Sequence, residues 1–592
     1  MSGRYSEDAL VERPALELLA ELGWETISAF EETFGPTGTL GRDSQREVIL
    51  IHRLRDALLA LNPAVPHQQR EEAVAEVVRN RSLMDPVRAN REIFHLLQDG
   101  FPVAWRDESG NQHSDRVQFI NWHRSDENDW LAASQVWVSS DVYKRRTDVI
   151  LFVNGIPLVL MEFKAANRKI RSAFDDNLRD YRVTIPQLFW PNAFVVLSNG
   201  SEARLGSTYA SWEYFGEWPR IDEDGQRGVI GLETLLRATC SPVRLLDLVE
   251  NFTAYTERPG GLVKAVARCH QFLGVNSAIE KLAEIRNTGD KRLGVFWHTQ
   301  GSGKSLSMLW FSQKVLRRMT GSWTFVMVTD RKELDEQLHG EFVDSGAVPQ
   351  QAGVHAESGA HLRELLAADH RYVFTLIHKF NRTVSERAGH AGMPVLSERD
   401  DIIVITDEAH RSQYDDLALN MRAALPNAMF MGFTGTPLMA GEELTRQEFG
   451  DYVSVYNFSD AIADGATVPL FYDNRIPELQ LTNDQFGEEL GELLESAEVD
   501  DDAEGDWPAV SRPSMRWSLA LNAYAPLPAT WCATSLGEGS PVRPCMSALT
   551  RQRPCACTTL CSRNGRPISL SCGRYMIRYP RWSGRGWRRK SS

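Results

Sequence analysis

The sequence predicts an α/β protein with two sheet-containing domains followed by an irregular tail, and three observations lead to this. Residues 1 to about 245 alternate between helical and strand-like patterns. From about 250, short apolar runs end in polar or glycine-containing loops, with helical patterns between them, as in a parallel sheet with crossover helices. Beyond about 510, no period of 2 or 3.6 residues is sustained.

The composition is that of an ordinary folded protein, with 42% hydrophobic and 24% charged residues in a chain of 592. No run of 18 apolar residues and no charged-then-apolar N-terminus occurs, so we expect no membrane span and a cytoplasmic protein. The net charge of −14 argues against a simple basic nucleic-acid binder. Cys240 and Cys269 lie far apart, which predicts a reduced body without disulfides.

The first domain is predicted over residues 1–245. SQREVILIHRLRDALLALNP has helical apolar spacing and ends in Asn-Pro, which predicts an amphipathic helix over Ser44–Pro63. TDVILFVNGIPLVLMEFK (Thr147–Lys164) predicts two strands joined at Asn154-Gly155, because Asn-Gly is typical of tight hairpin turns. Ala193–Gly200 predicts a further short buried strand.

The second domain is predicted over residues 246–465 as a parallel sheet. Its strands are predicted from five apolar runs: Leu293–His298, Thr324–Asp330, Tyr372–Phe380, Asp401–His410 and Ala428–Pro437. Ligands of open α/β sheets bind beyond the carboxyl ends of the strands, and the motifs of this domain fall there.

A phosphate-binding loop is predicted where the first of these strands ends, in HTQGSGKS. The backbone amides of Gly301, Ser302 and Gly303 can turn toward phosphate oxygens. Lys304 would reach the β and γ phosphates, and Ser305 would bind Mg²⁺. The helix that begins near Lys304 adds its positive N-terminal end.

Two further motifs at strand ends support an ATP site. Asp407 ends the run IIVITD and suits Mg²⁺ coordination, while Glu408 suits polarising the attacking water. FTGTP (Phe433–Pro437) ends a third strand with hydroxyls that could sense the γ-phosphate. The loop itself is an imperfect match, because His298 stands at the usual first glycine. The order of the three motifs nevertheless predicts ATP and Mg²⁺ binding, whereas the alternative is a solvated acidic loop.

A second metal site is predicted on the hairpin, where Asp148, Glu162 and Lys164 form D-x13-E-x-K. Two carboxylates can hold a divalent metal, and Lys164 can position water or neutralise developing charge. Side chains alternate between faces along a strand, so a two-residue Asn154-Gly155 loop would place the two carboxylates on opposite faces. An odd-length loop or a bulge is needed, and we predict a three-residue connection, Asn154–Ile156, that sets Asp148 against Glu162.

The order GSGKS, DEAH and TGTP resembles the first motor domain of superfamily 2 helicases and translocases. RCHQFLGVNSAIEKL (Arg268–Leu282) is similar to that superfamily's Q motif, which implies that Gln271 contacts the adenine edge. The alternative is an ordinary glutamine at a helix start. VTDRKELDEQL (Val328–Leu338) resembles motif Ia, which implies contact with the DNA backbone.

The hairpin resembles the PD-(D/E)xK nuclease motif of type I restriction enzyme R (HsdR) subunits, where it directly precedes a helicase-like motor. Thr147 replaces the motif's nominal proline. The resemblance implies that Glu47 is a helical acidic residue near the metal; the alternative is a surface glutamate. NLRDY (Asn177–Tyr181) is similar to the family's QxxxY element, which positions DNA, with Asn177 in place of glutamine. FSDAIADGATVPLFY (Phe458–Tyr472) resembles the passage that joins the two motor domains.

The resemblance covers roughly residues 10 to 500 and implies the following architecture: a PD-(D/E)xK nuclease domain (1–245), a RecA-like motor domain (246–465), the start of a second motor domain with an acidic linker (466–510), and an irregular tail (511–592). The implied activity is ATP-driven translocation of double-stranded DNA coupled to Mg²⁺-dependent cleavage. The implied partners are modification (M) and specificity (S) subunits. The alternatives are a stand-alone superfamily 2 translocase or helicase, and an inactive relic that binds DNA.

The tail departs from the family. Trp507–Ser592 holds thirteen Arg, one Lys, one acidic residue and six of the eight cysteines. Our hypothesis is a shift of reading frame near 505–515; the alternatives are a zinc-binding tail and a basic DNA-binding tail. Such motors hydrolyse ATP between two lobes, and loss of a trans-acting arginine costs ~10³–10⁵ in rate. We therefore expect ATP binding with little hydrolysis. The acidic run Asp484–Asp506 is expected to be a solvated linker or a DNA mimic.

Overall fold

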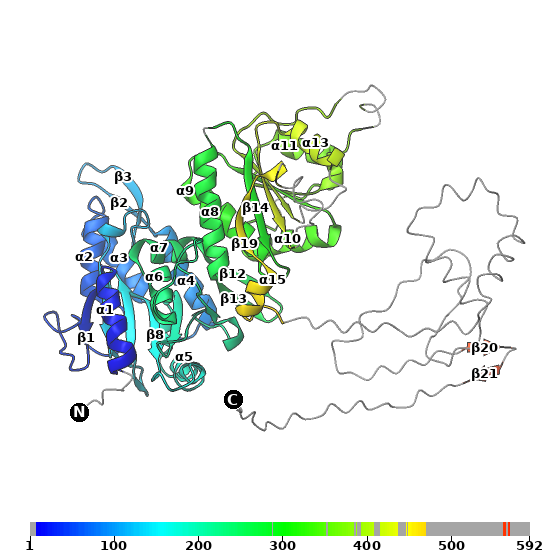
Figure 1. Cartoon of the computed structure of the whole chain (residues 1–592). Coiled ribbons are helices and arrows are strands. Elements are labelled where there is room, and N and C mark those ends of the chain that lie inside the picture. The colour runs from blue at the N-terminus through cyan, green and yellow to red at the C-terminus, as the bar shows by residue number, and fades with distance from the viewer. Residues whose placement is uncertain are drawn as a thin grey trace, which may run out of the picture. The chain divides into compact units, whose positions relative to one another are not determined.

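The computed structural model of the chain (Figure 1) describes residues 8–286, 288–350, 353–383, 386, 392–407, 415–435, 446, 448–468, 561–563 and 566–568. Contacts divide the chain into two units, Met1–Tyr472 and Asp473–Ser592. The second unit contributes one described antiparallel pair, β20 (Cys561–Arg563) and β21 (Arg566–Ile568). The predictions for the acidic run, the frame shift, the zinc site and a second motor domain lie outside the described residues.

The N-terminal part of the first unit is built on a mixed sheet with the order β1-β4-β7-β8-β9-β10-β11. β1 runs parallel to β4 and β8 runs parallel to β9, whereas the other neighbours are antiparallel. The strands are β1 (Glu25–Ser28), β4 (Trp130–Ser134), β7 (Val149–Val153), β8 (Ile156–Phe163), β9 (Phe194–Ser198), β10 (Ala203–Ser207) and β11 (Gly216–Glu217). Two hairpins accompany the sheet: β2 (Phe101–Arg106) with β3 (Gln112–Val117), and β5 (Trp137–Ser139) with β6 (Lys144–Arg146).

The central strand β7 is buried on both faces and divides its side chains between two cores. Val149, Leu151 and Val153 pack into one core, whereas Ile150 and Phe152 pack into the other. The surrounding helices are α1 (Arg13–Glu21), α2 (Ile51–Leu61), α3 (His67–Val78), α4 (Pro86–Asp99), α5 (Arg179–Thr184), α6 (Gly231–Thr239) and α7 (Pro242–Asn251), with shorter π or 3-10 segments η1 (Asp8–Glu12), η2 (Ser125–Glu127), η3 (Ala173–Leu178), η4 (Pro186–Phe189) and η5 (Trp212–Tyr214). Each face of the sheet therefore has its own hydrophobic layer.

The helix predicted over Ser44–Pro63 is confirmed only as α2, and its N-terminal third is wrong. The reason is Arg42, whose side chain is 1% exposed and pairs with the carboxylate of Glu32 at 2.6 Å. The same guanidinium donates to the backbone carbonyl of Glu47 at 2.8 Å, the acceptor that a helix through Glu47 would use. Glu47 consequently lies in a loop, where its carboxylate accepts the backbone N–H of Asp43 at 3.0 Å.

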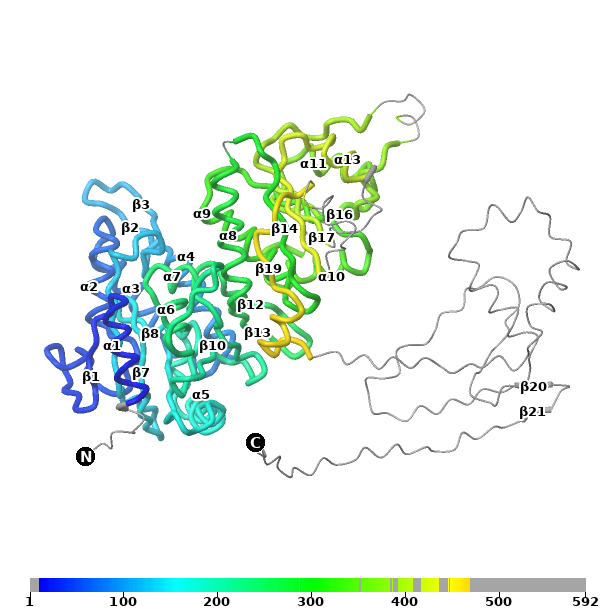
Figure 2. The backbone as a smooth tube through the Cα atoms, viewed as in Figure 1, coloured from blue at the N-terminus to red at the C-terminus, as the bar shows by residue number. Residues whose placement is uncertain are grey.

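The C-terminal part of the first unit (Figure 2) is a parallel sheet. Its strand order is β16-β15-β17-β18-β14-β19. Its strands are β14 (Arg292–His298), β15 (Thr324–Thr329), β16 (Tyr372–Leu376), β17 (Ile402–Asp407), β18 (Met429–Thr434) and β19 (Tyr452–Tyr456). The helices are α8 (Cys269–Ile285), α9 (Lys304–Arg318), α10 (Lys332–Asp344), α11 (Gly359–Ala367), α13 (Asp415–Ala424) and α15 (Phe458–Ala463), preceded by the hairpin β12 (Thr253–Arg258) and β13 (Gly261–Val266). All five predicted strands exist, which confirms the predicted parallel sheet.

Two details of that sheet differ from the sequence prediction. The run Tyr372–Phe380 is a strand only to Leu376, and Ile377–Phe380 form a 3-10 turn, η6. β19 was not predicted, and it pairs with β14 at the edge of the sheet. Its mixture of half-buried and buried residues lacks the continuous apolar run used to identify the other strands.

Two further expectations can be compared with the described residues. Cys240 and Cys269 are buried and free of disulfide bonds, as their spacing predicted. Within the described ranges, no helix is both long enough and apolar enough to cross a membrane.

Candidate functional site

The hairpin connection between β7 and β8 differs from the prediction, yet the predicted register is present. Asn154 and Gly155 form a two-residue turn, because Val153 pairs with Ile156, so the predicted three-residue connection is wrong. Both turn residues have positive φ, 52° and 78°, as a type I′ hairpin turn requires. This conformation makes the short turn favourable.

A β-bulge restores the parity that the short turn would otherwise reverse. The register shifts between Leu151 and Phe152, after which Val149 pairs with Met161. One step further along both strands, Asp148 stands opposite Glu162. Pro157 lies at the shift, and a bulge is one of the few positions at which a sheet tolerates proline. The bulge therefore places the two predicted carboxylates on the same face.

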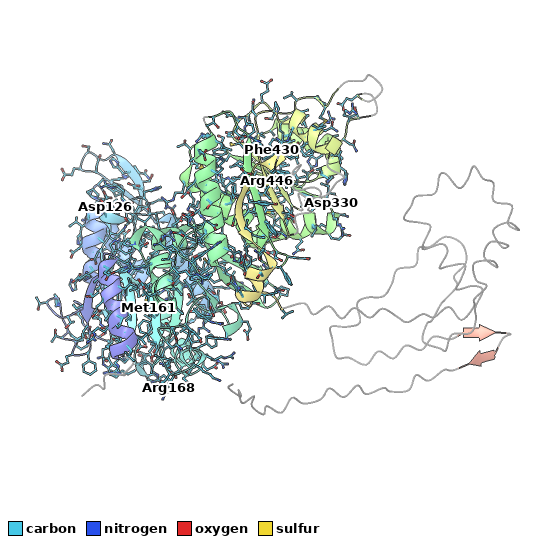
Figure 3. All side chains as sticks on the ribbon, viewed as in Figure 1. Asp126, Met161, Arg168, Asp330, Phe430 and Arg446 are labelled. Atoms are coloured by element: carbon cyan, nitrogen blue, oxygen red, sulfur yellow. The ribbon has the colours of Figure 1, made fainter. Side chains whose placement is uncertain are left out.

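The side chain of Asp148 is held in place by the backbone of the opposite strand, β8. Its Oδ2 accepts the N–H of Phe163 at 2.7 Å. Burial raises the pKa of the Asp148 carboxyl, and the hydrogen bond from Phe163 together with the charges of Lys164 and Arg146 oppose that rise. Met161, next to Glu162 on β8, marks the position of this strand in Figure 3.

Glu162 is 1% exposed, and only one of its carboxylate oxygens accepts hydrogen bonds from the described residues. Oε1 accepts the side-chain amide of Asn177 at 2.8 Å and the hydroxyl of Tyr181 at 3.2 Å. Burial, and then the charge of Asp148, raise the pKa of the Glu162 carboxyl well above its ordinary value. Among the described residues, Oε2 receives no N–H or O–H hydrogen bond.

These residues fit a small, hard cation such as Mg²⁺. A buried carboxylate oxygen without a donor is costly, and a metal ion would offset that cost. Mg²⁺ is commonly held by one or two carboxylates together with water. Lys164 is close enough for its charge to oppose the rise in the pKa of both acids. No group of three or more His, Cys, Asp or Glu suited to a metal occurs in the described part of the chain, so Glu47 is not seen to join them.

The predicted phosphate loop follows β14 and leads into α9, whose first residue is Lys304. Gly301 and Gly303 have φ of 82° and 84°, in the left-handed region. The φ of Gly303 favours glycine, and a Cβ there would also lie 2.5 Å from Nε2 of Gln271. Ser302 is buried, while Lys304 and Ser305 are partly exposed at the start of the helix.

Gln271 contacts the backbone of this loop in the structure. Its Nε2 donates to the carbonyls of Ser302, at 3.3 Å, and Gly303, at 3.1 Å. Its Oε1 accepts the N–H of Arg268 at 2.9 Å, which caps α8. The ring of His270 also reaches the Ser302 carbonyl, at 3.0 Å, and stacks on Tyr456. The segment predicted as a Q motif therefore holds the backbone of the phosphate loop through hydrogen bonds.

The strand register brings Asp407 to the same edge of the sheet. Phe433 of β18 pairs with Asp407 on one side and with Phe296 of β14 on the other. The three strands thus end together, next to the loop that leads from β14 into α9 and Ser305. Glu408, Thr436 and Pro437 lie outside the described residues.

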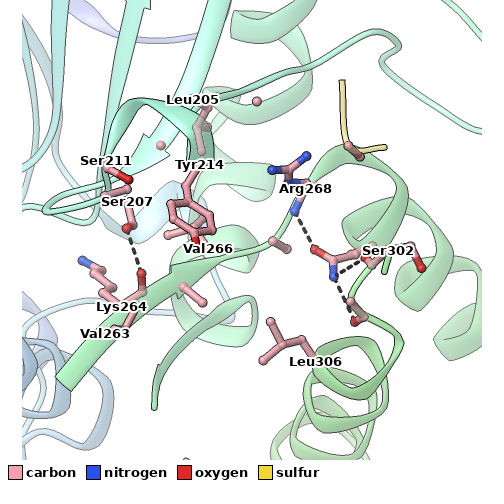
Figure 4. Close-up of a pocket in the computed structure, with 18 of the residues that line it drawn as sticks. Leu205, Ser207, Ser211, Tyr214, Val263, Lys264, Val266, Arg268, Ser302 and Leu306 are labelled. Carbon is pink, nitrogen blue, oxygen red and sulfur yellow. Dashed lines mark hydrogen bonds between the residues drawn. The ribbon is translucent and has the colours of Figure 1, made fainter. Parts of the chain in front are cut away.

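A cavity of about 850 Å³ opens beside the loop (Figure 4). Ser302 and Leu306 line it from the loop and α9, and Arg268 lines it from the start of α8. Tyr214 and Lys264 complete its opposite side. Its size suits a nucleoside portion of a ligand whose phosphates occupy the loop.

The sequence singled out Asn177 and Tyr181 through their resemblance to the QxxxY element, but it did not identify them as the residues that hold the Glu162 carboxylate. Their spacing of four on a helical segment, which places both side chains on one face, is a further local signal. Pro157 was likewise a signal for the bulge, because proline within a central strand is confined to such irregularities.

Fold and site together define a protein in which a PD-(D/E)xK-type nuclease fold precedes a RecA-like ATPase fold. Residues 4–214 match the family model described as type I restriction enzyme R protein N terminus. Residues 270–503 match the SWI2/SNF2 ATPase family.

Two curated relatives are similar over most of the chain. The type I restriction enzyme HindI endonuclease subunit of Haemophilus influenzae is 36% identical, covering 82% of this chain and 48% of the relative. A putative type I restriction enzyme MjaIXP endonuclease subunit of Methanocaldococcus jannaschii is 31% identical, covering 83% and 48%. A solved ATP-dependent type ISP restriction-modification enzyme, LlaBIII, bound to DNA covers 35% of this chain and 16% of its own, with 16% identity and a TM-score of 0.25.

The chain belongs to the family of type I restriction enzyme R subunits, as its hairpin and motor motifs predicted. It spans about half the length of the curated relatives it matches.

Proposed function

We propose that this chain cleaves double-stranded DNA in a Mg²⁺-dependent reaction at Asp148, Glu162 and Lys164. The observation that carries the proposal is the bulged register, which brings the buried carboxylate of Glu162 together with the half-buried carboxylate of Asp148 beside a lysine. In the family context, this cleavage is coupled to ATP-driven translocation in a complex with M and S subunits.

The residues of the chain have distinct tasks in this reaction. Asp148 and Oε2 of Glu162 would hold Mg²⁺, which when bound activates water and stabilises charge on the phosphate. Lys164 neutralises charge that develops as the phosphate is attacked. Glu162 must be ionised to bind the cation, and its raised pKa means that burial opposes this ionisation. Cleavage should therefore increase with pH.

We further propose that ATP binds where the parallel strands end. Gly301, Ser302 and Gly303 would cradle the phosphates, and Lys304 would neutralise them. Mg²⁺ would be held by Ser305 and Asp407, with Glu408 polarising the attacking water. Gln271 and the adjoining cavity would receive the adenine. Of the residues proposed for the nuclease site, Glu47 has the least support as a metal ligand, because its carboxylate already accepts the backbone N–H of Asp43.

Two alanine variants test the two sites separately. Lys164→Ala should abolish Mg²⁺-dependent nicking of plasmid DNA while leaving ATP binding intact. Lys304→Ala should abolish ATP binding, measured with a fluorescent ATP analogue. Nicking by wild-type protein would argue against an inactive relic, whereas ATPase without any nicking would favour a stand-alone translocase. Weak ATP turnover stays a prediction, and robust DNA-stimulated hydrolysis would contradict it.

A further inference from the structure

The hairpin β5–β6 stands directly before Asp148 in the chain, and its two faces differ sharply. Trp137 pairs with Arg146, Val138 with Arg145, and Ser139 with Lys144. Because side chains alternate along a strand, Lys144 and Arg146 share one face with Trp137, and Arg145 shares the other with Val138.

The inner face is fixed to the domain. Val138 is 1% exposed and belongs to the hydrophobic core that also contains Tyr181. Arg145 pairs with both carboxylate oxygens of Asp180 on α5. The inner face therefore has its charge neutralised and its apolar side chain buried.

The outer face carries positive charges that form no ion pair with any described acid. Lys144 and Arg146 are exposed, and neither takes part in an ion pair within the described residues. Instead, both lie over the indole of Trp137, at 4.4 and 5.6 Å from its centre. Arg146 also lies 5.5 Å from the ring of Phe30, which is 56% exposed. Cations above aromatic rings remain available for anions, because the rings supply no formal charge.

The hairpin's own acid does not change this balance. Asp141, in the turn of the hairpin, pairs with Arg46 at 3.1 Å. Arg168, labelled in Figure 3, and Lys169 follow the end of β8; both are exposed, and neither forms an ion pair with another described residue. In a chain with net charge −14, this is a local excess of positive charge.

One side chain and the chain itself connect the outer face to the carboxylate pair. Tyr181 donates to the backbone carbonyl of Arg146 at 2.8 Å and approaches Oε1 of Glu162 at 3.2 Å. Arg146 also stands only two residues before Asp148 in the chain. A nucleic-acid backbone whose phosphates contact Arg146 would thus pass beside Asp148 and Glu162.

We propose that the outer face of the β5–β6 hairpin, formed by Trp137, Lys144 and Arg146, binds the phosphate backbone of double-stranded DNA beside Asp148 and Glu162. The inference rests on the proposed nuclease function, since it names the surface that presents DNA to that site. Cations supply the affinity for phosphate, and the fixed inner face supplies the position.

The test is the salt dependence of DNA binding by the full chain. A labelled duplex is titrated in EDTA, which prevents cleavage, at several salt concentrations. The plot of log K against log salt concentration has a negative slope, and each lost phosphate contact reduces the magnitude of that slope by about 1. The double variant Lys144→Gln with Arg146→Gln should reduce the magnitude by about 2. The matched pair Lys144→Arg with Arg146→Lys retains both charges and should keep the wild-type slope.

Two controls make the outcome specific. Arg13→Gln removes an exposed charge from α1 and should leave the slope unchanged. In wild-type protein, duplex DNA should protect Lys144 from acetylation but not Lys281 on α8. An unchanged slope in the double glutamine variant, or unprotected Lys144, would overturn the inference. Plasmid nicking with Mg²⁺ is measured separately. Absent nicking would refute the proposed function, whereas the contact between DNA and the hairpin is judged from the binding data alone.

Discussion

Asn177 donates its side-chain amide to Oε1 of Glu162 at 2.8 Å, joining the segment η3 to the strand that carries a predicted metal ligand. Tyr181 donates to the same oxygen at 3.2 Å. Both partners occupy one oxygen and orient the other, Oε2, so they are positioning residues for the proposed metal site.

Replacing either positioning residue should weaken Mg²⁺ use. Asn177→Ala or Tyr181→Phe is expected to lower nicking about 10–100-fold, as loss of a partner behind a metal ligand commonly does. The Mg²⁺ concentration for half-maximal nicking should rise, a change that a merely structural role would not produce. Asn177→Gln should restore part of the activity, and Asn111→Ala on the distant β2–β3 hairpin should have no effect. Equal loss at saturating Mg²⁺ with an unchanged half-maximal concentration would contradict this role.

Glu162→Gln should stabilise the metal-free protein at neutral pH. The folded pKa of Glu162 lies well above its ordinary value of 4.5, so the folded state keeps a proton that the unfolded state releases. Stability from this group is therefore highest in acid and falls as the pH rises above about 4.5. The variant should melt at a higher temperature than wild type at pH 8 in EDTA, and the gap should close toward pH 4. Mg²⁺ should raise the melting temperature of wild type alone. An equal response of both proteins to Mg²⁺ would argue against Glu162 as a ligand.

Gly155→Ala should destabilise the N-terminal domain by about 1–3 kcal/mol, because an L-residue at φ +78° is strained. Its Cβ would also meet the Leu50 carbonyl at 2.5 Å. Gly110→Ala is the matched control, with φ +83° and no atom within 4 Å of the added Cβ. The difference between the two melting curves reports the clash alone. If both variants lost the same free energy of unfolding, the close contact with Leu50 would contribute nothing to the destabilisation.

Gln271→Glu should separate the two roles of that side chain. A carboxylate can still accept the Arg268 N–H but cannot donate to the carbonyls of Ser302 and Gly303. Two lost hydrogen bonds correspond to roughly a tenfold weaker ATP affinity. Gln271→Ala should lose the helix cap as well and lower the melting temperature further. Unchanged ATP binding by the glutamate variant would show that the contact with the loop is dispensable. Fluorescence titration with an ATP analogue measures these affinities.

The sequence was most informative where one local rule governs the outcome. Continuous apolar runs predicted the five strands from Leu293 onward, since parallel strands are buried on both faces. It was least informative at Ser44–Leu50, where helical apolar spacing is overridden by the distant pairing of Arg42 with Glu32. The roles of the predicted site residues stay predictions, although Asp148 and Glu162 do lie together.

By itself, the sequence determined which residues form the hairpin and that Asp148 and Glu162 flank it, because Asn-Gly turns and apolar runs are local signals. Only the tertiary structure decided that the two carboxylates share a face. That outcome depends on one extra residue in β8, whose bulge is stabilised by pairing with β7 and by hydrogen bonds from Ala193 and Asn192 to the Leu158 carbonyl. The hydrogen bonds from Asn192 and Ala193 link positions more than thirty residues apart, and no local pattern specifies them.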